Sequence, residues 1–194
     1  MRTRILGIDP GSRVTGFAIL DADGHVYTSP CCTTIILSKI ADPNERLKHL
    51  YSEFTKIIDE YQPDECAIES PVYGKDPSAM LKLGRAQASI IMSLLHSKLA
   101  VYEYYPKAVK ISVTGSGNST KAQVAYMLNK IVAITNPKPS ADATDALAIA
   151  WCHYQKIINP AKKQPTTGDN NTNSRKINTW SNFVDSHPER ISKS

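Results

Sequence analysis

The sequence has no uninterrupted run of 18 apolar residues, which excludes an ordinary membrane-spanning helix. Its first residues, MRTRILG, lack an apolar signal core followed by a small-residue cleavage site. The four cysteines lack the paired C-x-x-C spacing of a zinc site, and the adjacent pair Cys31 and Cys32 is poorly placed for a disulfide. We therefore expect a soluble, cytosolic protein whose thiols are reduced and mainly pack in the core.

Strong overall charge is absent as well. The net charge of the 194 residues is +5, and residues 159–194 hold six Lys and Arg against three Asp and Glu, so residues 1–158 carry only +2. Any nucleic-acid footprint on that larger part must therefore be local. The length suits one hydrophobic core, and we expect a single domain over residues 1–158.

Residues 159–194 are predicted to form a basic, largely disordered C-terminal tail. Residues 159–174 are almost free of large apolar groups, as is typical of a disordered linker. The last twenty residues place four apolar side chains at helical spacing, namely Ile177, Trp180, Phe183 and Val184. This pattern fits either a docking peptide or a tail that packs on itself.

The first sixty residues predict three strands followed by a helix. Apolar segments at residues 5–9, 15–20 and 25–36 are separated by D-P-G-S and Asp-Gly turn chemistry, which predicts an antiparallel meander. Asp42, Pro43 and Glu45 resemble a capping box, and apolar residues keep helical spacing as far as Tyr61.

Strands and helices alternate in the rest of the domain, which indicates an α/β fold. We expect strands at 65–69 and 101–105, and helices at 77–99, from Ser119 or Thr120 to 131, and from Ser140 or Ala141 to 157. The predicted sheet is mixed and five-stranded, with the meander joined by parallel strands. The helix at 77–99 is apolar nearly all round, so it should be covered by the sheet and by either a second subunit or more of its own chain.

Two carboxylates end segments that are otherwise apolar. Asp9 closes the first strand directly before Pro10 and Gly11, and Glu69 closes the strand at 65–69. Taken singly, Asp9 could be a turn residue and Glu69 a solvated acid. Because an unpaired buried carboxylate is costly, two of them in one sheet favour a shared functional site.

A second pair of acids begins the last predicted helix. Asp142 and Asp145 are three residues apart and share one helix face. They could simply complement the helix dipole, an effect of about 0.3–1 kcal/mol. The same helix carries small residues that would allow close packing on a sheet, at Ala141, Ala143, Ala146, Ala148 and Ala150. Acids on a closely packed helix need partners.

The four acids would repel one another if they met. Two carboxylates at about 5 Å repel by roughly 3 kcal/mol at an effective dielectric constant of about 20, so the cluster needs cations. An oxygen-only set of ligands selects Mg²⁺ or Mn²⁺ over zinc, and a two-ion carboxylate site is typical of phosphodiester hydrolysis. The predicted metal and catalytic residues are Asp9, Glu69, Asp142 and Asp145.

Five segments together resemble the RuvC-type Holliday-junction resolvases, in order, over residues 1 to about 158: ILGIDPGSRVTG, AIESPVYGKDPSAMLKLGRAQ, VYEYYPKAVK, TGSGNSTKAQV and ADATDALAIAWCH. The resemblance implies an RNase H-like fold, a homodimer, and Mg²⁺-dependent paired nicking of four-way DNA junctions. It also implies cooperation with the RuvAB branch-migration complex in bacterial recombination and repair. Within the site, we expect two ions with Asp9 bridging them, Glu69 and Asp145 binding one each, and Asp142 completing a shell or orienting the water.

Several basic residues could contact DNA or could simply be solvated. Lys75, Lys82 and Arg85 lie along or just before the helix at 77–99, Lys110 follows the last predicted strand, and Lys121 opens the next helix. Similarity to the family favours Lys110 and Lys121 as DNA contacts, with Lys75 as a further candidate.

The sequence departs from the family after Glu69. Family members often place an aromatic wedge about three positions downstream, where this chain has Val72 followed by Tyr73. Tyr73 could stack on an unpaired base or pack over the rim of the site.

Three other functions share some of these features. The G-I-D-x-G segment also occurs in phosphate-binding hairpins of the actin, Hsp70 and sugar-kinase group, but this chain has one copy and no second Gly-rich loop. A YqgF-like nuclease in RNA processing would have a similar fold, and a DNA-binding module could have lost catalysis. The long motif from Ala67 and the four acids favour the resolvase.

Overall fold

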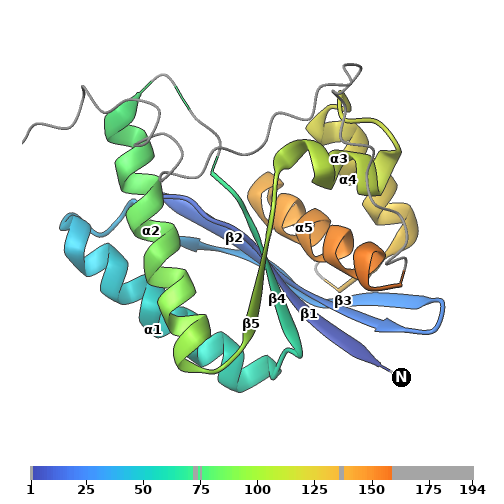
Figure 1. Cartoon of the computed structure of the whole chain (residues 1–194), viewed down its shortest axis with the longest axis horizontal. Helices are drawn as coiled ribbons and strands as arrows, with labels where there is room; N and C mark the ends of the chain where they lie inside the picture. Colours follow the sequence, from blue (N-terminus) through green and yellow to red (C-terminus); the bar gives the residue numbers. More distant parts are fainter. Residues whose placement is uncertain (1, 72–73, 75, 136–137, 159–194) are drawn as a thin grey trace, which may run out of the picture. The chain divides into compact units, whose positions relative to one another are not determined.

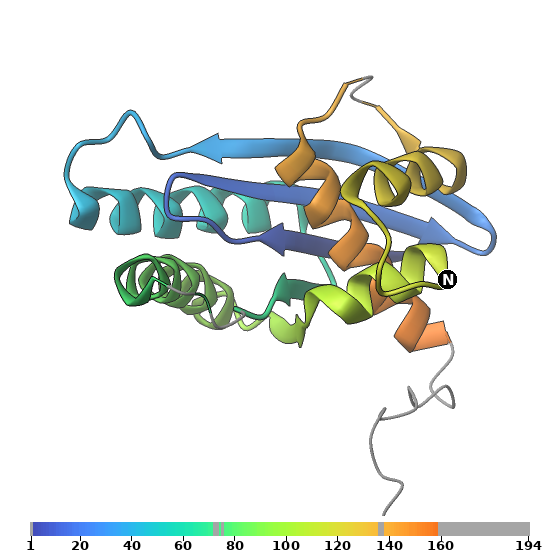
Figure 2. The same ribbon diagram turned by 90° about the horizontal axis from the view of Figure 1, so that it is seen from above.

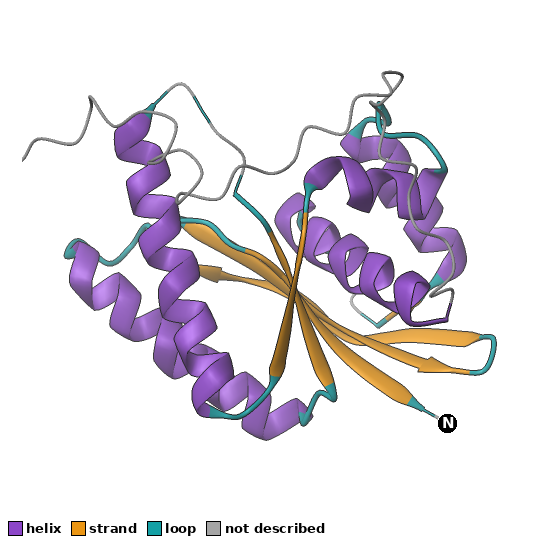
Figure 3. Ribbon diagram, in the orientation of Figure 1, coloured by secondary structure: helices purple, strands orange, loops and turns teal. Residues whose placement is uncertain are grey.

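The computed structural model describes residues 2–71, 74, 76–135 and 138–158, and the predicted tail lies outside these residues. Six strands form one mixed sheet in the order β5-β4-β1-β2-β3-β6 (Figure 3). They are β1 (Thr3–Asp9), β2 (Val14–Asp23), β3 (Val26–Ile36), β4 (Glu65–Glu69), β5 (Ala100–Tyr104) and β6 (Ala133–Ile134). The helices are α1 (Pro43–Tyr61), α2 (Pro77–His96), α3 (Pro106–Thr114), α4 (Lys121–Ile131) and α5 (Ala141–Ile158).

The predicted meander and the predicted α/β pattern are confirmed. β1, β2 and β3 pair antiparallel, whereas β4 pairs parallel to β1 and β5 parallel to β4. Gly24 makes the β2–β3 turn at φ 58°, in the left-handed region that glycine adopts without strain. The sheet has six strands rather than the five predicted, because the two-residue β6 beside β3 is too short for an alternating pattern to be recognised.

Helices cover both faces of the sheet (Figures 1 and 2). α1 and α2 enclose one core with the sheet, centred on Phe54, Ile68 and Ile90. α3, α4 and α5 enclose the other, which contains most of α5 and the ring of Trp151. The four cysteines are free thiols, as expected. No helix in the described part of the chain has the length and apolar character needed to cross a membrane.

The helix starts follow from their caps. The Asp42 side chain accepts the backbone N–H of Asn44 at the start of α1. At α4 the N-cap is Thr120, one of the two residues predicted, and it forms a reciprocal capping box with Gln123. The Thr120 cap determines the position of Lys121, because Lys121 is the first residue of α4.

α3 was not predicted from the sequence. It is only nine residues long, and its β-branched residues Val109, Ile111 and Val113 are typical of a strand. Its signals lie at the ends instead, with Pro106 in the first turn and Gly115 at φ 77° after the last. The helix matters because it carries Lys110 to the candidate site.

α2 packs one face on α1 and the edge of the sheet and leaves apolar side chains on another. Its buried residues are Ala86, Gln87, Ile90, Ser93 and Leu94. Within the single chain, Leu81, Met92 and Leu95 are 57%, 58% and 55% exposed. α2 packs mainly on α1 and also on β5 at the edge of the sheet, so its own chain covers it in part, and these three side chains define an exposed apolar strip that neither element covers.

α5 lies unusually close to β1 and β2, at two glycines. A Cβ added to Gly7 would lie 2.1 Å from the carbonyl oxygen of Ala146, and one added to Gly16 would lie 2.0 Å from that of Asp142. Backbone atoms cannot move aside as a flexible side chain can, so neither position admits a side chain without displacing the helix. The small residues of α5 and of the two strands therefore set how closely α5 packs on the sheet.

Gly7→Ala should accordingly destabilise the protein by about 1–3 kcal/mol or more through overpacking, measured by urea or thermal unfolding. Gly84→Ala is the matched control, because a Cβ there meets nothing within 4 Å and the position lies inside α2. That control should be neutral or stabilising by up to about 1 kcal/mol. Equal stability of Gly7→Ala and the unsubstituted protein would contradict the close contact.

Candidate active site

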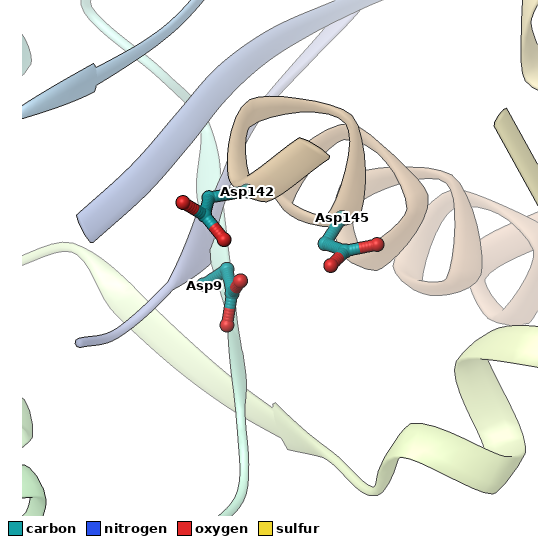
Figure 4. Close-up of side chains that lie close together, drawn as sticks. All are labelled: Asp9, Asp142 and Asp145. Carbon is teal, nitrogen blue, oxygen red and sulfur yellow. The ribbon is translucent and has the colours of Figure 1, made fainter. Parts of the chain in front are cut away.

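The four predicted acids converge at one edge of the sheet. β1 and β4 run parallel with Ile8 opposite Ile68, so the next residues, Asp9 and Glu69, emerge side by side at the carboxyl ends of the two strands. The first turns of α5 bring Asp142 and Asp145 to the same edge (Figure 4). One carboxylate oxygen each from Asp9, Asp142 and Asp145 lies within 4.8 Å of the other two.

Glu69 belongs to the same site although it is not part of that close trio. Its side chain hydrogen-bonds to Asp9, and both residues line a cavity of about 280 Å³. The cavity wall also contains Pro106, Val109, Lys110, Lys121, Val124, Asp145 and Ala148. Asp142 does not line this cavity, although it lies beside Asp9 at the start of α5 (Figure 4).

The crowding of these acids changes their proton affinity. Burial, followed by the charges of Glu69 and Asp145, raises the pKa of Asp9 from 3.8 to about 8. Burial and the charge of Asp145 also raise the pKa of Glu69, while its hydrogen bond with Asp9 acts in the opposite direction. The raised pKa of Asp9 favours its protonated form at neutral pH, and a protonated Asp9 can donate to the carboxylate of Glu69.

Two lysines face the acids. The ammonium group of Lys121 donates to Asp145 and forms an ion pair with it, which raises the pKa of the lysine. Lys110, on α3, lines the cavity and lowers the pKa of Glu69 through its charge. Both residues were predicted as DNA contacts, and the structure brings both to the acid site. Lys75, Val72 and Tyr73 lie outside the described residues, so their predicted roles remain predictions.

The backbone carbonyl group of Glu69 accepts a hydrogen bond from a residue that the sequence analysis did not identify. The amide of Gln87, a buried residue of α2, donates to the carbonyl oxygen of Glu69 at 3.5 Å and to Glu103 at 3.4 Å. Ser70 donates to the same Glu103 carboxylate at 3.3 Å. The sequence signal for Gln87 is a glutamine on the buried face of an apolar helix, because a buried amide group requires hydrogen-bond partners.

The donor set fits divalent cations. All four acids offer oxygen, the ligand that Mg²⁺ and Mn²⁺ prefer, and the metal-sized group found among the described residues consists of carboxylates alone. Burial and the charges of Glu69 and Asp145 raise the pKa of Asp9 although the charge of Lys121 opposes this shift, so added positive charge at the site would be favourable. A site with excess negative charge and a neighbouring lysine can bind metal ions and a phosphate group together, which suits phosphodiester hydrolysis.

Comparison with known proteins places the chain in a family. The sequence profile described as "Crossover junction endodeoxyribonuclease RuvC" matches residues 5–153. The protein of that name from Salinibacter ruber is 42% identical over 189 residues, which cover 97% of this chain and 99% of the relative.

Solved structures of RuvC proteins have a similar fold. The Thermus thermophilus RuvC structure matches with a TM-score of 0.73 at 25% identity, over 82% of this chain and 97% of that protein. T. thermophilus RuvC in complex with a Holliday junction substrate matches with a TM-score of 0.72 at 20% identity, over 80% of this chain and 95% of that one. The RNase H-like fold expected from the sequence is thereby confirmed.

The raised pKa of Asp9 predicts how stability depends on pH without metal. Because the pKa of Asp9 is about 8 in the folded protein and near 3.8 when unfolded, folding takes up a proton between these values. The contribution of Asp9 to stability is therefore full below about pH 4 and is lost as the pH rises through about 8. Thermal unfolding in EDTA across pH 5–9 should show this loss in the unsubstituted protein and not in Asp9→Asn.

The difference between those two proteins isolates Asp9 together with Glu69, whose titration is coupled to it, because the remaining titrating groups are common to both. One of them is His153, whose pKa burial lowers and whose contribution to stability therefore has the opposite pH dependence. Parallel melting curves for the two proteins across the whole range would contradict a raised pKa at Asp9.

Proposed function

Because the chain belongs to the RuvC family of crossover junction endodeoxyribonucleases, we propose that it is a structure-selective endonuclease that resolves Holliday junctions by paired, symmetric nicks. The convergence of four half-buried carboxylates from three elements on one edge of the sheet supports this function most directly. The family match over residues 5–153 favours it over a YqgF-like nuclease and over a phosphate-binding domain of the actin or Hsp70 type.

The catalytic and metal-binding residues in this proposal are Asp9, Glu69, Asp142 and Asp145. They would hold two Mg²⁺ ions, with Mn²⁺ as a substitute, and the bound ions would supply an activated water and stabilise the leaving oxygen. A carboxyl group must lose its proton to bind a cation, so substrate cleavage would require Asp9, whose pKa is raised, to be ionised.

Lys121 and Lys110 would bind the phosphodiester beside the acids. Lys121 is paired with Asp145, and when cations neutralise that carboxylate the ammonium group becomes available to a phosphate oxygen. Lys110 approaches from α3 on the same cavity wall. Lys75 and Tyr73, which follow Glu69 in the sequence, are retained as proposed DNA contacts.

Symmetric nicking requires two active sites related by a two-fold axis, and a homodimer supplies them. The exposed apolar strip of α2, formed by Leu81, Met92 and Leu95, supports this assembly, because an uncovered strip of large apolar side chains is typical of an interface. By family membership the dimer would act with the RuvAB branch-migration complex in the bacterial cytoplasm, in DNA recombination and repair.

Asp9→Asn should abolish nicking of a synthetic four-way junction in Mg²⁺, because it removes the central carboxylate of the cluster. Binding of the same junction in Ca²⁺ should remain close to that of the unsubstituted protein, since no proposed phosphate contact is lost. The measurements are gel assays of cleavage and fluorescence anisotropy of binding, with the linear duplex arms of the junction as the substrate control.

Two results would contradict this function. Nicking retained by Asp9→Asn would remove Asp9 from the mechanism. Equal cutting of the junction and of its linear arms by the unsubstituted protein would replace a resolvase by a general nuclease.

Dimer formation is tested at the strip itself. The unsubstituted protein should elute as a dimer in size-exclusion chromatography with light scattering, and Met92→Glu with Leu95→Glu should shift it to a monomer by placing charge in the interface. Lys48→Glu, an exposed change on α1, is the control for added negative charge and should remain dimeric. A monomer for the unsubstituted protein at micromolar concentration would exclude the proposed assembly.

A further inference from the structure

A second cavity, of about 160 Å³, lies between the N-terminal halves of α1 and α2. Its inner surface is aliphatic, because Leu37 and Leu50 are fully buried beneath it and Ala86 is almost so. The half-buried Leu47 completes this floor. None of the four acids lines the cavity, so it is distinct from the site described above.

Three cations surround the aliphatic floor. Arg46 comes from α1, while Lys82 and Arg85 stand three residues apart on one side of α2 (Figure 1 shows the two helices). In the part of the chain that the structure describes, none of the three forms an ion pair with a carboxylate. Arg46 donates its Nε to the carbonyl oxygen of Ile40 at 2.7 Å, which orients the guanidinium group and leaves its terminal nitrogens for another acceptor.

No Asp or Glu is among the described residues that line the cavity, and the acids close to these cations in sequence have other partners. Asp42 and Asp76 accept backbone N–H groups as the N-caps of α1 and α2. Glu45 pairs with Lys48 along α1. The rim of the cavity therefore carries excess positive charge, and a ligand that balances it must bring negative charge.

The β1–β2 turn connects this cavity to the acid site. Asp9 at its start lines the acid cavity, and Ser12 within it lines the second cavity. The turn is held rigidly, since Thr15 exchanges hydrogen bonds with Gly11 through its hydroxyl group. The backbone N–H of Leu37 also donates to the carbonyl oxygen of Arg13 at 2.9 Å, which ties the turn to the cavity floor.

We propose that this cavity binds an unpaired nucleotide of the junction strand next to the one that is cut, with its phosphate on Arg46, Lys82 and Arg85 and its base on the aliphatic floor. The inference rests on the proposed function. A duplex stacks its bases inside the helix, so its outer surface could use the cations but not a recessed apolar floor. An unpaired nucleotide offers both an anion and an apolar face, as in other single-strand sites.

The phosphate half of the proposal is tested by charge removal. Lys82→Gln with Arg85→Gln should lower junction affinity in Ca²⁺ by roughly tenfold or more and reduce the slope of log K against log salt by about 1 to 2. Lys48→Gln, on α1 outside the cavity, should leave both values unchanged. Manganese binding measured by calorimetry should be unaltered in all of these proteins, since the acids are untouched.

The base half is tested with 2-aminopurine placed at each position flanking the crossover. Binding by the unsubstituted protein should change its fluorescence at one position, and Ala86→Leu, which fills the cavity without changing charge, should remove that change. Leu47→Gln is a second variant with a polar floor, in case the larger side chain at position 86 prevents folding. Thermal unfolding verifies that each variant is folded.

The outcomes separate this inference from the proposed function. A fluorescence change that persists in both floor variants would overturn the base site, and affinity and salt slope unchanged in the charge variant would overturn the phosphate site. Either result, with normal nicking by the unsubstituted protein, would leave the resolvase function intact. Failure of the unsubstituted protein to bind or nick the junction would instead reject the proposed function.

Discussion

The close contact of α5 with β1 and β2 is the constraint on which the site depends. Gly7 and Gly16 leave no Cβ on the strand surface where the backbone of the helix touches it. This contact lowers the first turns of α5 onto the end of β1, so that Asp142 and Asp145 meet Asp9. A helix held farther away by ordinary side chains would leave the acids too far apart to share a cation.

The same contact creates an electrostatic conflict that the metal-free protein resolves only in part. The raised pKa of Asp9 favours its protonated form beside Glu69, and Asp145 forms an ion pair with the ammonium group of Lys121. Each device holds a carboxylate in place without a metal, and each is reversible, because the proton can leave and the lysine can turn to a phosphate. Perturbed groups of this kind in a cleft are typical of functional sites, where binding supplies the missing charge.

Most elements of the fold could be read from local patterns. The turns of the meander, the Pro43 start of α1 and the Thr120 cap of α4 are local interactions, and each is found where it was predicted. α3 and β6 were missed because their local signals are weak or misleading: α3 carries β-branched residues, and β6 has two residues. Both are held by packing against the rest of the fold rather than by their own propensity.

The sequence by itself determined the four acids, the oxygen-only chemistry that they offer and the family to which they belong, because these depend on residue type and order. Tertiary structure alone decided that Glu69 lies beside Asp9 and that Lys121 forms an ion pair with Asp145. It also decided that Gln87 of α2 donates to the backbone at the end of β4. It also decided that the cations of α1 and α2 surround one aliphatic cavity. The physical reason is that these contacts join segments distant in the chain, and their distances are set by how helices pack on the sheet, which no local pattern encodes.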